Sequence, residues 1–308
     1  MSGLYQRRKT MKILNFGSLN LDYVYRMHHF IRPGETAAAI ERTLVCGGKG
    51  LNQSIAIARS GAVLYHAGNI GAEDGTPLRE LLLSAGVNVD YLRERDMPGG
   101  HTVIQVNDDG ENAIILYPGA NACTDVEQIR ETLSHFDKGD LLVLQNEISC
   151  IPELIRIASE KGMKIAMNPS PVDGTGKYPL NLLHYLFVNE AEAAYLAGTS
   201  DNPENVLRGK LPDTSLIITC GAKGALYVGQ DGTRIWQPSV PVQAVDTTAA
   251  GDTFMGYFLG RLIMGEPVQT CLQAASYAAA LSVMRPGAAP SIPVFDEVVC
   301  FMNSSSKA

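Results

Sequence analysis

Two kinds of segment alternate along most of the chain. Short, almost continuously apolar runs, such as KILNFG at 12–17 and DLLVLQNE at 140–147, are typical of strands buried on both faces of a sheet. Longer segments place apolar residues three and four positions apart, as in GLNQSIAIARSG at 50–61 and CIPELIRIASEKG at 150–162. This spacing predicts helices that lay one apolar face against the sheet.

The same alternation continues through further segments. The pattern predicts a strand at 62–71, a helix at 75–87, a strand at 164–171, a strand entering a helix at 185–198, and a strand entering a Gly-rich turn at 215–228. Strands that alternate with helices predict an α/β fold with a mostly parallel central sheet and helices on both faces. Ligands of such sheets bind at the carboxyl ends of the strands. The residues predicted at those ends are Asn146, Glu147, Asn168, Asn189, Thr219 and Gly221.

Two regions interrupt this order. Residues 22–46 are rich in β-branched and aromatic residues around a Pro-Gly turn, and residues 101–117 predict a hairpin with the turn NDDGEN. Each region is too short to enclose a core, so we expect both to form a small β-sheet lid on the larger unit. We therefore expect one α/β domain over 11–300, with a disordered extension at 1–10 and a tail at 301–308.

Composition and charge narrow the classes of function. Of 308 residues, 45% are hydrophobic, which is enough for a substantial core. The net charge of −7 argues against a general nucleic-acid binder, although a local positive field can still bind an anionic small ligand. The six cysteines form no C-x-x-C pair, and no signal peptide or membrane span is visible, so we expect a cytoplasmic protein with reduced thiols. Met11 is a candidate for the true start.

The segment VDTTAAGDTFMG at 245–256 places a carboxylate at the start of an apolar helix predicted at about 252–264. The N–H groups of Ala250, Gly251 and Asp252 would have no partner inside the helix, and the small side chains leave them open to an anion. A carboxylate beside such a site can accept a proton from a nucleophile, an arrangement that suits phosphoryl transfer. The alternative is that Asp252 only caps the helix.

Two more polar segments indicate a ligand site. VCGGKGLNQ resembles a P-loop but has Gly50 where Ser or Thr is required. It predicts instead a tight turn that brings Lys49 and Asn52 against a polar ligand, or a turn with a structural role alone. In GSLNLD, Asn20 and Asp22 share one face of an extended chain and suit sugar hydroxyls. An Asx turn is the alternative.

Taken together, the ordered motifs resemble the ribokinase (PfkB-type) carbohydrate kinases over about residues 12–300. The matching segments are GSLNLD, GGKGLNQS, LQNE, NPSP, VNEAE, TCGAKGAL, VDTTAAGDTFMG and RPGAAPSIP. Each segment is a weak signal alone, but their common order is specific. The resemblance implies an ATP-dependent kinase that phosphorylates O5 of D-ribose, with Mg²⁺ as cofactor and K⁺ as a monovalent activator.

The resemblance also implies a role for each matching residue. Asp252 would be the catalytic base, beside an anion hole formed by Ala249, Ala250 and Gly251. The residues implied in sugar binding are Asn20, Asp22, Gly48, Lys49, Asn52 and Glu147. Those implied in binding ATP and its Mg²⁺ are Asn189, Glu192, Thr219, Gly221 and Gly224. Those implied in a monovalent-cation site are Asp246, Thr248, Ser282, Arg285, Gly287 and Ser291.

The chain departs from the family pattern at two positions. Ala249 stands where the family often has Gly, and Tyr257 stands where a small residue is preferred after Gly256. The pair His28–His29 could suggest a metal, but no further ligands follow at a suitable spacing, so we expect a surface role in the lid.

Other functions were weighed. A kinase of the same fold for deoxyribose, a ketohexose derivative or a nucleoside remains an alternative, as does a sugar sensor without catalysis. A dinucleotide-dependent oxidoreductase is disfavoured because no G-x-G-x-x-G follows the first strand. The hairpin segment AIILY is apolar on both faces, and only one face of a lid can cover the sugar. We therefore predict a homodimer joined lid to lid, as the resemblance also implies.

Overall fold

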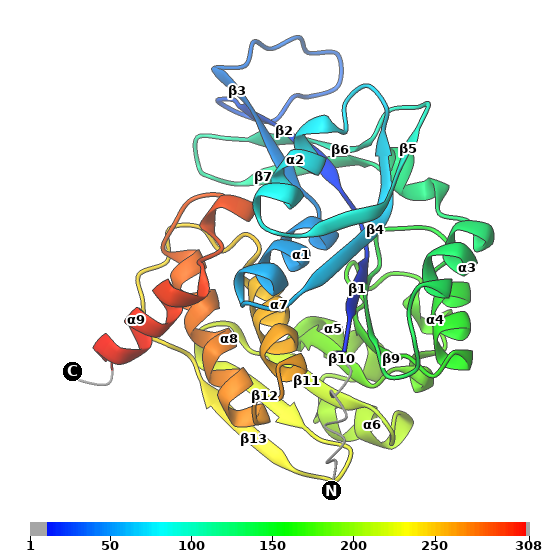
Figure 1. Ribbon diagram of the computed structural model, residues 1–308. Helices are drawn as coiled ribbons and strands as arrows, with labels where there is room; N and C mark the ends of the chain where they lie inside the picture. Colours follow the sequence, from blue (N-terminus) through cyan, green and yellow to red (C-terminus); the bar gives the residue numbers. More distant parts are fainter. Residues whose placement is uncertain (1–10, 306–308) are drawn as a thin grey trace, which may run out of the picture.

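A computed structural model describes residues 11–305 of the protein (Figure 1). The extension expected at 1–10 lies outside the described residues. The described chain forms a nine-stranded sheet and a four-stranded sheet, with helices packed around the larger one. The last helix ends at Ser305 and so continues past residue 300, where the sequence suggested the end of the domain.

The main sheet has the mostly parallel arrangement that the sequence predicts. The parallel part of the sheet runs from β5 through β4, β1, β8, β9 and β10 to β11, and the hairpin β12–β13 extends the sheet through antiparallel pairings. From one edge to the other, the strands are β13 (Arg234–Pro238), β12 (Gly224–Val228), β11 (Ser215–Thr219), β10 (Tyr185–Asn189), β9 (Lys164–Asn168), β8 (Leu141–Gln145), β1 (Ile13–Phe16), β4 (Leu64–Gly71) and β5 (Asn88–Arg95).

Helices cover both faces of this sheet. On one face lie α1 (Lys49–Arg59), α2 (Thr76–Ser84), α7 (Ala250–Ile263), α8 (Val268–Val283) and α9 (Phe295–Ser305). On the other lie α3 (Val126–Ser134), α4 (Ile151–Glu160), α5 (Glu190–Ala197) and α6 (Pro203–Lys210). Successive residues of a strand point to opposite faces. Ile13 of β1 accordingly packs in the first core and Leu14 in the second, and Leu141 and Leu142 of β8 divide in the same way.

Several elements of the structure were not predicted, and one predicted helix, α7, begins earlier than expected. The elements that were not predicted are β5, β13, α3, α6, α8 and α9. β5 was not predicted, because it is an edge strand with a partly exposed pattern and carries charged residues at its end instead of a continuous apolar run. α7 spans Ala250–Ile263. It begins about two residues before the predicted start at residue 252. The first turn therefore includes Ala250 and Gly251, which were expected just outside it.

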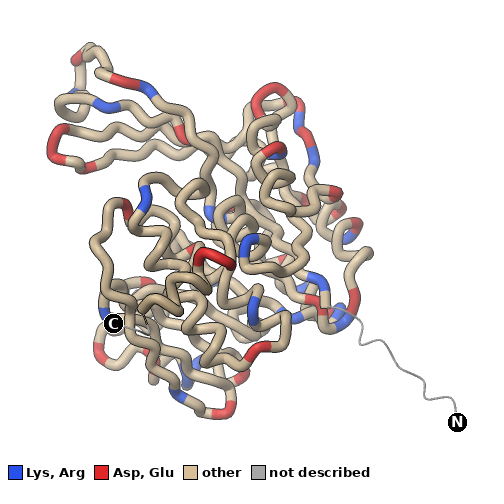
Figure 2. The backbone as a smooth tube through the Cα atoms, turned by 60° about the vertical axis from the view of Figure 1, so that its left-hand side comes forward, with Lys and Arg blue, Asp and Glu red and all other residues tan. Residues whose placement is uncertain are grey.

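The lid is a separate four-stranded sheet with the order β3–β2–β6–β7. Its strands are β2 (Asn20–Arg26), β3 (Glu41–Gly47), β6 (Gly100–Val106) and β7 (Asn112–Tyr117). The predicted hairpin is present as the antiparallel pair β6–β7. Figure 2 shows that the lid projects beyond the helices of the larger unit. The chain passes from β1 into β2 within a few residues, so the lid begins where the main sheet ends.

Candidate active site

Three of the sequence motifs meet at the carboxyl ends of β1 and β8. Ser18, just after β1, donates a hydrogen bond from its hydroxyl to the carboxylate of Glu147, which follows β8. The backbone N–H of Lys49, at the start of α1, donates to the same carboxylate oxygen at 3.0 Å. The Lys49 ammonium lies 3.9 Å from the other oxygen. Glu147 therefore joins the loop after β1 to the glycine-rich turn.

The glycine-rich turn needs its glycines for two separate reasons. Gly48, which caps α1, has φ +96°, in the left-handed region that favours glycine. At Gly50 the need is space, because a Cβ there would lie 2.4 Å from the backbone nitrogen of Ser18. The turn therefore lets α1 begin directly against the loop that leads into the lid.

Asp252 lies in the first turn of α7 and is only 8% exposed. Two successive residues of α1 hold its carboxylate. The Asn52 amide donates to Oδ2 at 3.1 Å, and the Gln53 amide donates to Oδ1 at 2.9 Å. The Asp252 carboxylate is therefore held in a fixed position at the start of α7.

The charges around Asp252 are balanced rather than uniform. Burial raises the pKa of Asp252, while Lys49 and the two amide donors lower it and the more distant Glu147 raises it. Burial also acts against the charged form of Lys49, but the carboxylates of Asp252, Glu147 and Glu192 outweigh it and raise the Lys49 pKa. A cation between carboxylates is a suitable environment for an anionic phosphoryl group that approaches a base.

The start of α7 presents unpaired donors to an open space. Ala249 precedes the helix with φ +60°, a left-handed conformation that explains why glycine is common at this position in the family. The N–H groups of Gly251 and Asp252 have no hydrogen-bond partner in the described part of the chain, and nothing lies within 4 Å of the place where a Gly251 Cβ would be. Such a helix start is suited to an anion.

Asn20 and Asp22 lie on β2, at the junction of lid and main sheet. Asn20 is buried, and its side-chain oxygen accepts a hydrogen bond from the Asn121 amide at 2.8 Å. Burial raises the pKa of Asp22, partly offset by the hydroxyl of Thr102, which donates to the carboxylate. Both predicted sugar ligands are therefore held by partners from other segments.

Sequence reasoning missed Asn121. It lies in the short helix η1 (Gly119–Cys123), which leads from β7 back to α3. Besides Asn20, it binds the loop after β1, because its Oδ1 accepts the Leu19 N–H at 3.0 Å. A single Asn between a hairpin and a helix carries no local signal for this role.

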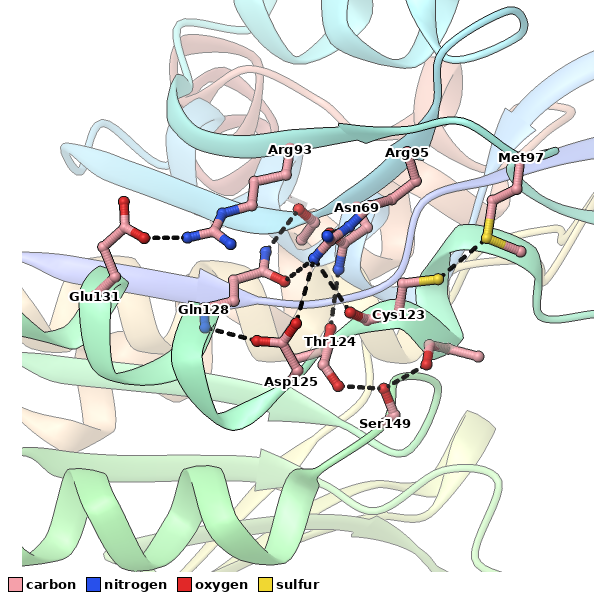
Figure 3. Close-up of polar contacts among 12 residues, drawn as sticks. Asn69, Arg93, Arg95, Met97, Cys123, Thr124, Asp125, Gln128, Glu131 and Ser149 are labelled. Carbon is pink, nitrogen blue, oxygen red and sulfur yellow. Dashed lines mark hydrogen bonds and ion pairs between the residues drawn. The ribbon is translucent and has the colours of Figure 1, made fainter.

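A polar network around Arg95 holds the segment that contains Asn121 (Figure 3). Arg95, at the end of β5, donates to Asn69 Oδ1 at 2.7 Å, to the Cys123 carbonyl at 3.2 Å and to Gln128 Oε1 at 3.0 Å. The Ser149 hydroxyl donates to the carbonyl oxygens just before and after Cys123. The return of the chain from the lid is thus tied to β4, β5 and α3. Arg95 was not predicted because β5 was not.

A cavity of about 510 Å³ lies beside the start of α7, a volume typical of small-molecule sites. Three of the five residues predicted to bind ATP and its Mg²⁺ line it, namely Thr219, Gly221 and Gly224. Ala250 and Gly251 form part of its wall. Much of the remaining wall is apolar and comes from α8 and from residues 240–244. The cavity therefore combines an apolar compartment with the anion-binding helix start.

Asn189 and Glu192 are not among the residues that line this cavity, and they are engaged with each other. The Asn189 side chain accepts the Glu192 N–H at 2.8 Å, and the Glu192 carboxylate accepts the Asn189 N–H at 3.0 Å, which forms the capping box of α5. Asn189 is also the register partner of Thr219 in the neighbouring strand. The other Glu192 oxygen has no recorded partner within 11–305, so a carboxylate oxygen remains for a hydrated Mg²⁺ ion, which prefers such ligands.

Asp246 joins two loops that the sequence places far apart. One oxygen accepts the N–H and the hydroxyl of Thr248 at 2.9 and 2.6 Å, and the other accepts the Gly287 N–H at 2.8 Å. Burial acts to raise the Asp246 pKa, but these hydrogen bonds outweigh it and lower the pKa. The result is an ionised carboxylate next to carbonyl and hydroxyl oxygens, a donor set that fits a hard cation.

Other members of the predicted cation set are less direct. The hydroxyls of Ser282 and Ser291 donate to backbone oxygens three residues earlier, which leaves lone pairs free to accept. The Arg285 guanidinium pairs with Glu297, so only its backbone is available to a cation. Tyr257 is buried and donates to the Pro293 carbonyl at 2.7 Å, which ties α7 to this loop.

The remaining polar predictions concern the lid and the thiols. His28 pairs with Asp108 and His29 with Glu35, each at 2.8 Å on the surface of the lid. No cluster of three or more His, Cys, Asp or Glu side chains suited to a metal occurs among residues 11–305. Over the same residues, no helix is long and apolar enough to cross a membrane, and the cysteines are free.

Comparison with known proteins identifies the family. Residues 10–294 match the family described as pfkB family carbohydrate kinase. The chain is 33% identical to a ribokinase of Haemophilus influenzae over 307 residues, covering 96% of this chain and 99% of that one. The crystal structure of a ribokinase from Thermotoga maritima superposes with a TM-score of 0.87 at 34% identity, covering 95% and 99%. Arabidopsis thaliana ribokinase complexed with ribose and ATP gives a TM-score of 0.85 at 27% identity, covering 96% and 99%. The chain belongs to the pfkB family of carbohydrate kinases and is an ATP-dependent sugar kinase.

Proposed function

We propose that this kinase phosphorylates the primary hydroxyl, O5, of D-ribose to give ribose 5-phosphate, with Asp252 as general base. The observation that carries the proposal is the place of the Asp252 carboxylate. It is buried, accepts a hydrogen bond from Asn52 and is stabilised by the charge of Lys49, in the helix turn whose Gly251 and Asp252 N–H groups are unpaired among the described residues. The similarity to ribokinases, one of them bound to ribose and ATP, supports ribose as the sugar.

The proposed sugar site combines polar groups of the lid sheet with polar groups of the main unit. Asn20 and Asp22 face it from the lid, and Lys49, Asn52 and Glu147 from the main unit. Asn52 supports this directly, because its side-chain oxygen is buried and has no hydrogen-bond partner among the described residues. A buried acceptor without a partner is costly, and a sugar hydroxyl would supply the missing donor.

The chemical step is a direct transfer. Asp252 accepts the proton of the O5 hydroxyl, O5 forms a bond to the γ-phosphorus of ATP, and the bond from that phosphorus to the bridging oxygen of ADP breaks. The N–H groups of Gly251 and Asp252, together with Ala249 and Ala250, form the anion hole for the charge on the transferred group. The lid covers the sugar and limits the access of water, which would otherwise hydrolyse ATP.

ATP would occupy the cavity beside α7, with its base in the apolar compartment and its phosphates toward Gly251. Asn189 and Glu192 would hold its Mg²⁺, which supplies charge neutralisation at the phosphates. A monovalent cation, K⁺ by preference, would bind near Asp246 and Thr248. By occupying the space between the two loops that Asp246 joins, it would hold the start of α7 in place.

An ATP-coupled screen tests the substrate. The screen compares D-ribose, 2-deoxy-D-ribose, D-fructose and adenosine, with ADP release and the phosphorylated product both measured. D-ribose should give the highest kcat/KM and a product phosphorylated at O5. A higher kcat/KM for another acceptor would replace ribose by that acceptor. Tight ribose binding without ADP release would favour a sugar sensor instead.

A further inference from the structure

A chain of buried amides runs from the middle of the main sheet to the proposed base. Asn15 of β1, Gln145 of β8 and Gln53 of α1 are each at most 1% exposed. Asn15 and Gln145 lie on neighbouring strands, and Gln53 lies above them on the helix that covers this face. None of the three was assigned a role from the sequence. Asp252 is the last acceptor of this series of hydrogen bonds.

The hydrogen bonds define a direction for every amide. The Asn15 amide nitrogen donates to the Gly50 carbonyl at 2.8 Å. The Gln145 amide nitrogen donates twice, to Asn15 Oδ1 at 2.9 Å and to Gln53 Oε1 at 2.7 Å. The Gln53 amide nitrogen then donates to Asp252 Oδ1 at 2.9 Å.

At each end of this series of amides the partner is an oxygen acceptor. The Gly50 carbonyl stands at one end and the Asp252 carboxylate at the other, and Asn15 and Gln53 turn their nitrogens outward and their oxygens inward. The residue between them must then donate in both directions. A primary amide has the two N–H groups that this requires, and Gln145 uses both.

Because Gln145 donates with both N–H groups, its own amide oxygen is left without a donor. Gln145 Oε1 is buried and has no hydrogen-bond partner within the described residues. Turning the Gln145 amide over would place that oxygen against two other oxygens, which is worse than leaving it unpaired. The arrangement thus keeps one unsatisfied acceptor in the core in exchange for a fixed direction of the Gln53 amide.

We propose that Gln145 is a positioning residue that fixes the Gln53 amide with its N–H toward Asp252, which keeps this carboxylate ionised and oriented toward the sugar. The proposal rests on the proposed role of Asp252 as base. If the Gln53 amide turned over, its oxygen would face the carboxylate, and repulsion would favour the protonated form.

The other charged groups around Asp252 do not replace this donor. Lys49 from α1 favours the ionised carboxylate, and Glu147 from the loop after β8 opposes it. His66 contacts the far end of the network through Ser54, but burial lowers its pKa to about 3. His66 is therefore neutral throughout the pH range in which the enzyme would be assayed.

The test measures the ionisation of Asp252 directly. The carboxyl signals of ¹³C-labelled aspartate are titrated by NMR, with Asp252 assigned by its absence in Asp252→Asn, and the pH dependence of kcat is recorded at saturating ribose and ATP. The variants are Gln53→Met and Gln145→Met, which keep the chain length but remove the donors. Ile57→Val is the control, because Ile57 is a buried apolar residue of the same helix.

Loss of one donor to the carboxylate should move the Asp252 titration and the acid limb of kcat upward by about one pH unit in both Gln variants. Gln145→Met should do so although its side chain does not touch Asp252, and Ile57→Val should leave both unchanged. An unchanged Asp252 titration in either folded Gln variant would overturn the proposal. If Gln145→Met does not fold, Gln145→Leu takes its place, because it also removes both donors without adding a charge, and an unchanged Asp252 titration in that variant would equally overturn the proposal.

The two measurements separate this inference from the proposed function. A shifted Asp252 titration without a shifted acid limb, together with an active Asp252→Asn enzyme, would support the amide chain and contradict the role of Asp252 as base. An inactive Asp252→Asn enzyme with an unshifted titration in the Gln variants would retain the base and overturn only the inference.

Discussion

The main sheet and the lid sheet differ in how far their apolar residues are buried. All five residues of β8 in the main sheet are buried, and helices cover both faces. In the lid, all six residues of β7 are exposed, including Ile114 at 56% and Ile115 at 64%. Both strands are rich in aliphatic residues, so the difference lies in what covers them.

The covered main sheet and the partly exposed lid are therefore suited to different tasks. The fixed carboxylate and the open helix start are supported by the covered sheet, where packing and hydrogen bonds determine positions closely. The lid carries the proposed sugar ligands on β2 but exposes an apolar strand on its outer edge. An exposed apolar strand calls for a partner surface, and a second lid would supply one. We therefore expect changes near the main sheet to affect chemistry and changes on β7 to affect association.

Asp252→Asn should give the largest effect. The amide has the same shape but cannot accept a proton from the sugar, so turnover should fall by about 10²- to 10⁴-fold, the usual contribution of a general base. Binding of ribose and ATP, measured by calorimetry, should persist, as should the predicted lid-to-lid dimer. Near-normal turnover in a folded variant would place the base elsewhere.

Ile115→Glu should affect the other region. A charge buried in an apolar interface without a partner weakens association strongly, so the dimer dissociation constant should rise by roughly 100-fold. Light scattering at micromolar concentration should give about twice the chain mass of 33.1 kDa for the unmodified protein and a monomer for the variant. Ser84→Glu, on an exposed helix end of the main unit, is the matched control and should stay dimeric. An unmodified protein that remains monomeric would refute the lid-to-lid dimer.

Removal of potassium should have an intermediate effect. If the cation holds the loops that Asp246 joins, K⁺ should raise kcat by about tenfold over K⁺-free buffer, equivalent to about 1.4 kcal/mol, and Na⁺ should raise it much less. KCl should also raise the melting temperature of the protein more than NaCl at the same ionic strength, and Asp246→Asn should abolish both differences. Equal rates with and without K⁺, in the absence of ammonium, would contradict the site.

Arg95→Met should give the smallest effect, and it tests the junction of the two regions. The guanidinium holds the segment that carries Asn121, which in turn holds Asn20. Loosening this segment should raise KM for ribose by about threefold while kcat and KM for ATP stay nearly unchanged. Arg93→Met is the control, because Arg93 lies two residues earlier on the same strand and pairs with Glu131 instead. A change in kcat equal to that of KM would place Arg95 in the chemical step instead.

Local pattern predicted most of the architecture. The apolar runs predicted β1, β4, β8 and β9, and the change of spacing predicted α1 and α4, because burial on both faces or on one face leaves a direct trace in the sequence. β5 was not predicted because an edge strand with charged residues lacks a continuous apolar run. The motifs around Lys49 and Asp252 were likewise visible, since glycine and small residues mark places where backbone must approach a ligand.

The sequence by itself thus determined many of the strands and helices and indicated the residues that we propose for the chemistry. Only the tertiary structure decided how those residues hold one another. Asn52 and Asp252 are 200 positions apart and are hydrogen-bonded, and Asn121 and Gln145 owe their partners to the crossing of separate segments. Periodicity reports the environment of each residue along its own element. The direction of a side-chain amide depends on the donors and acceptors that folding brings to it, and no local pattern contains them.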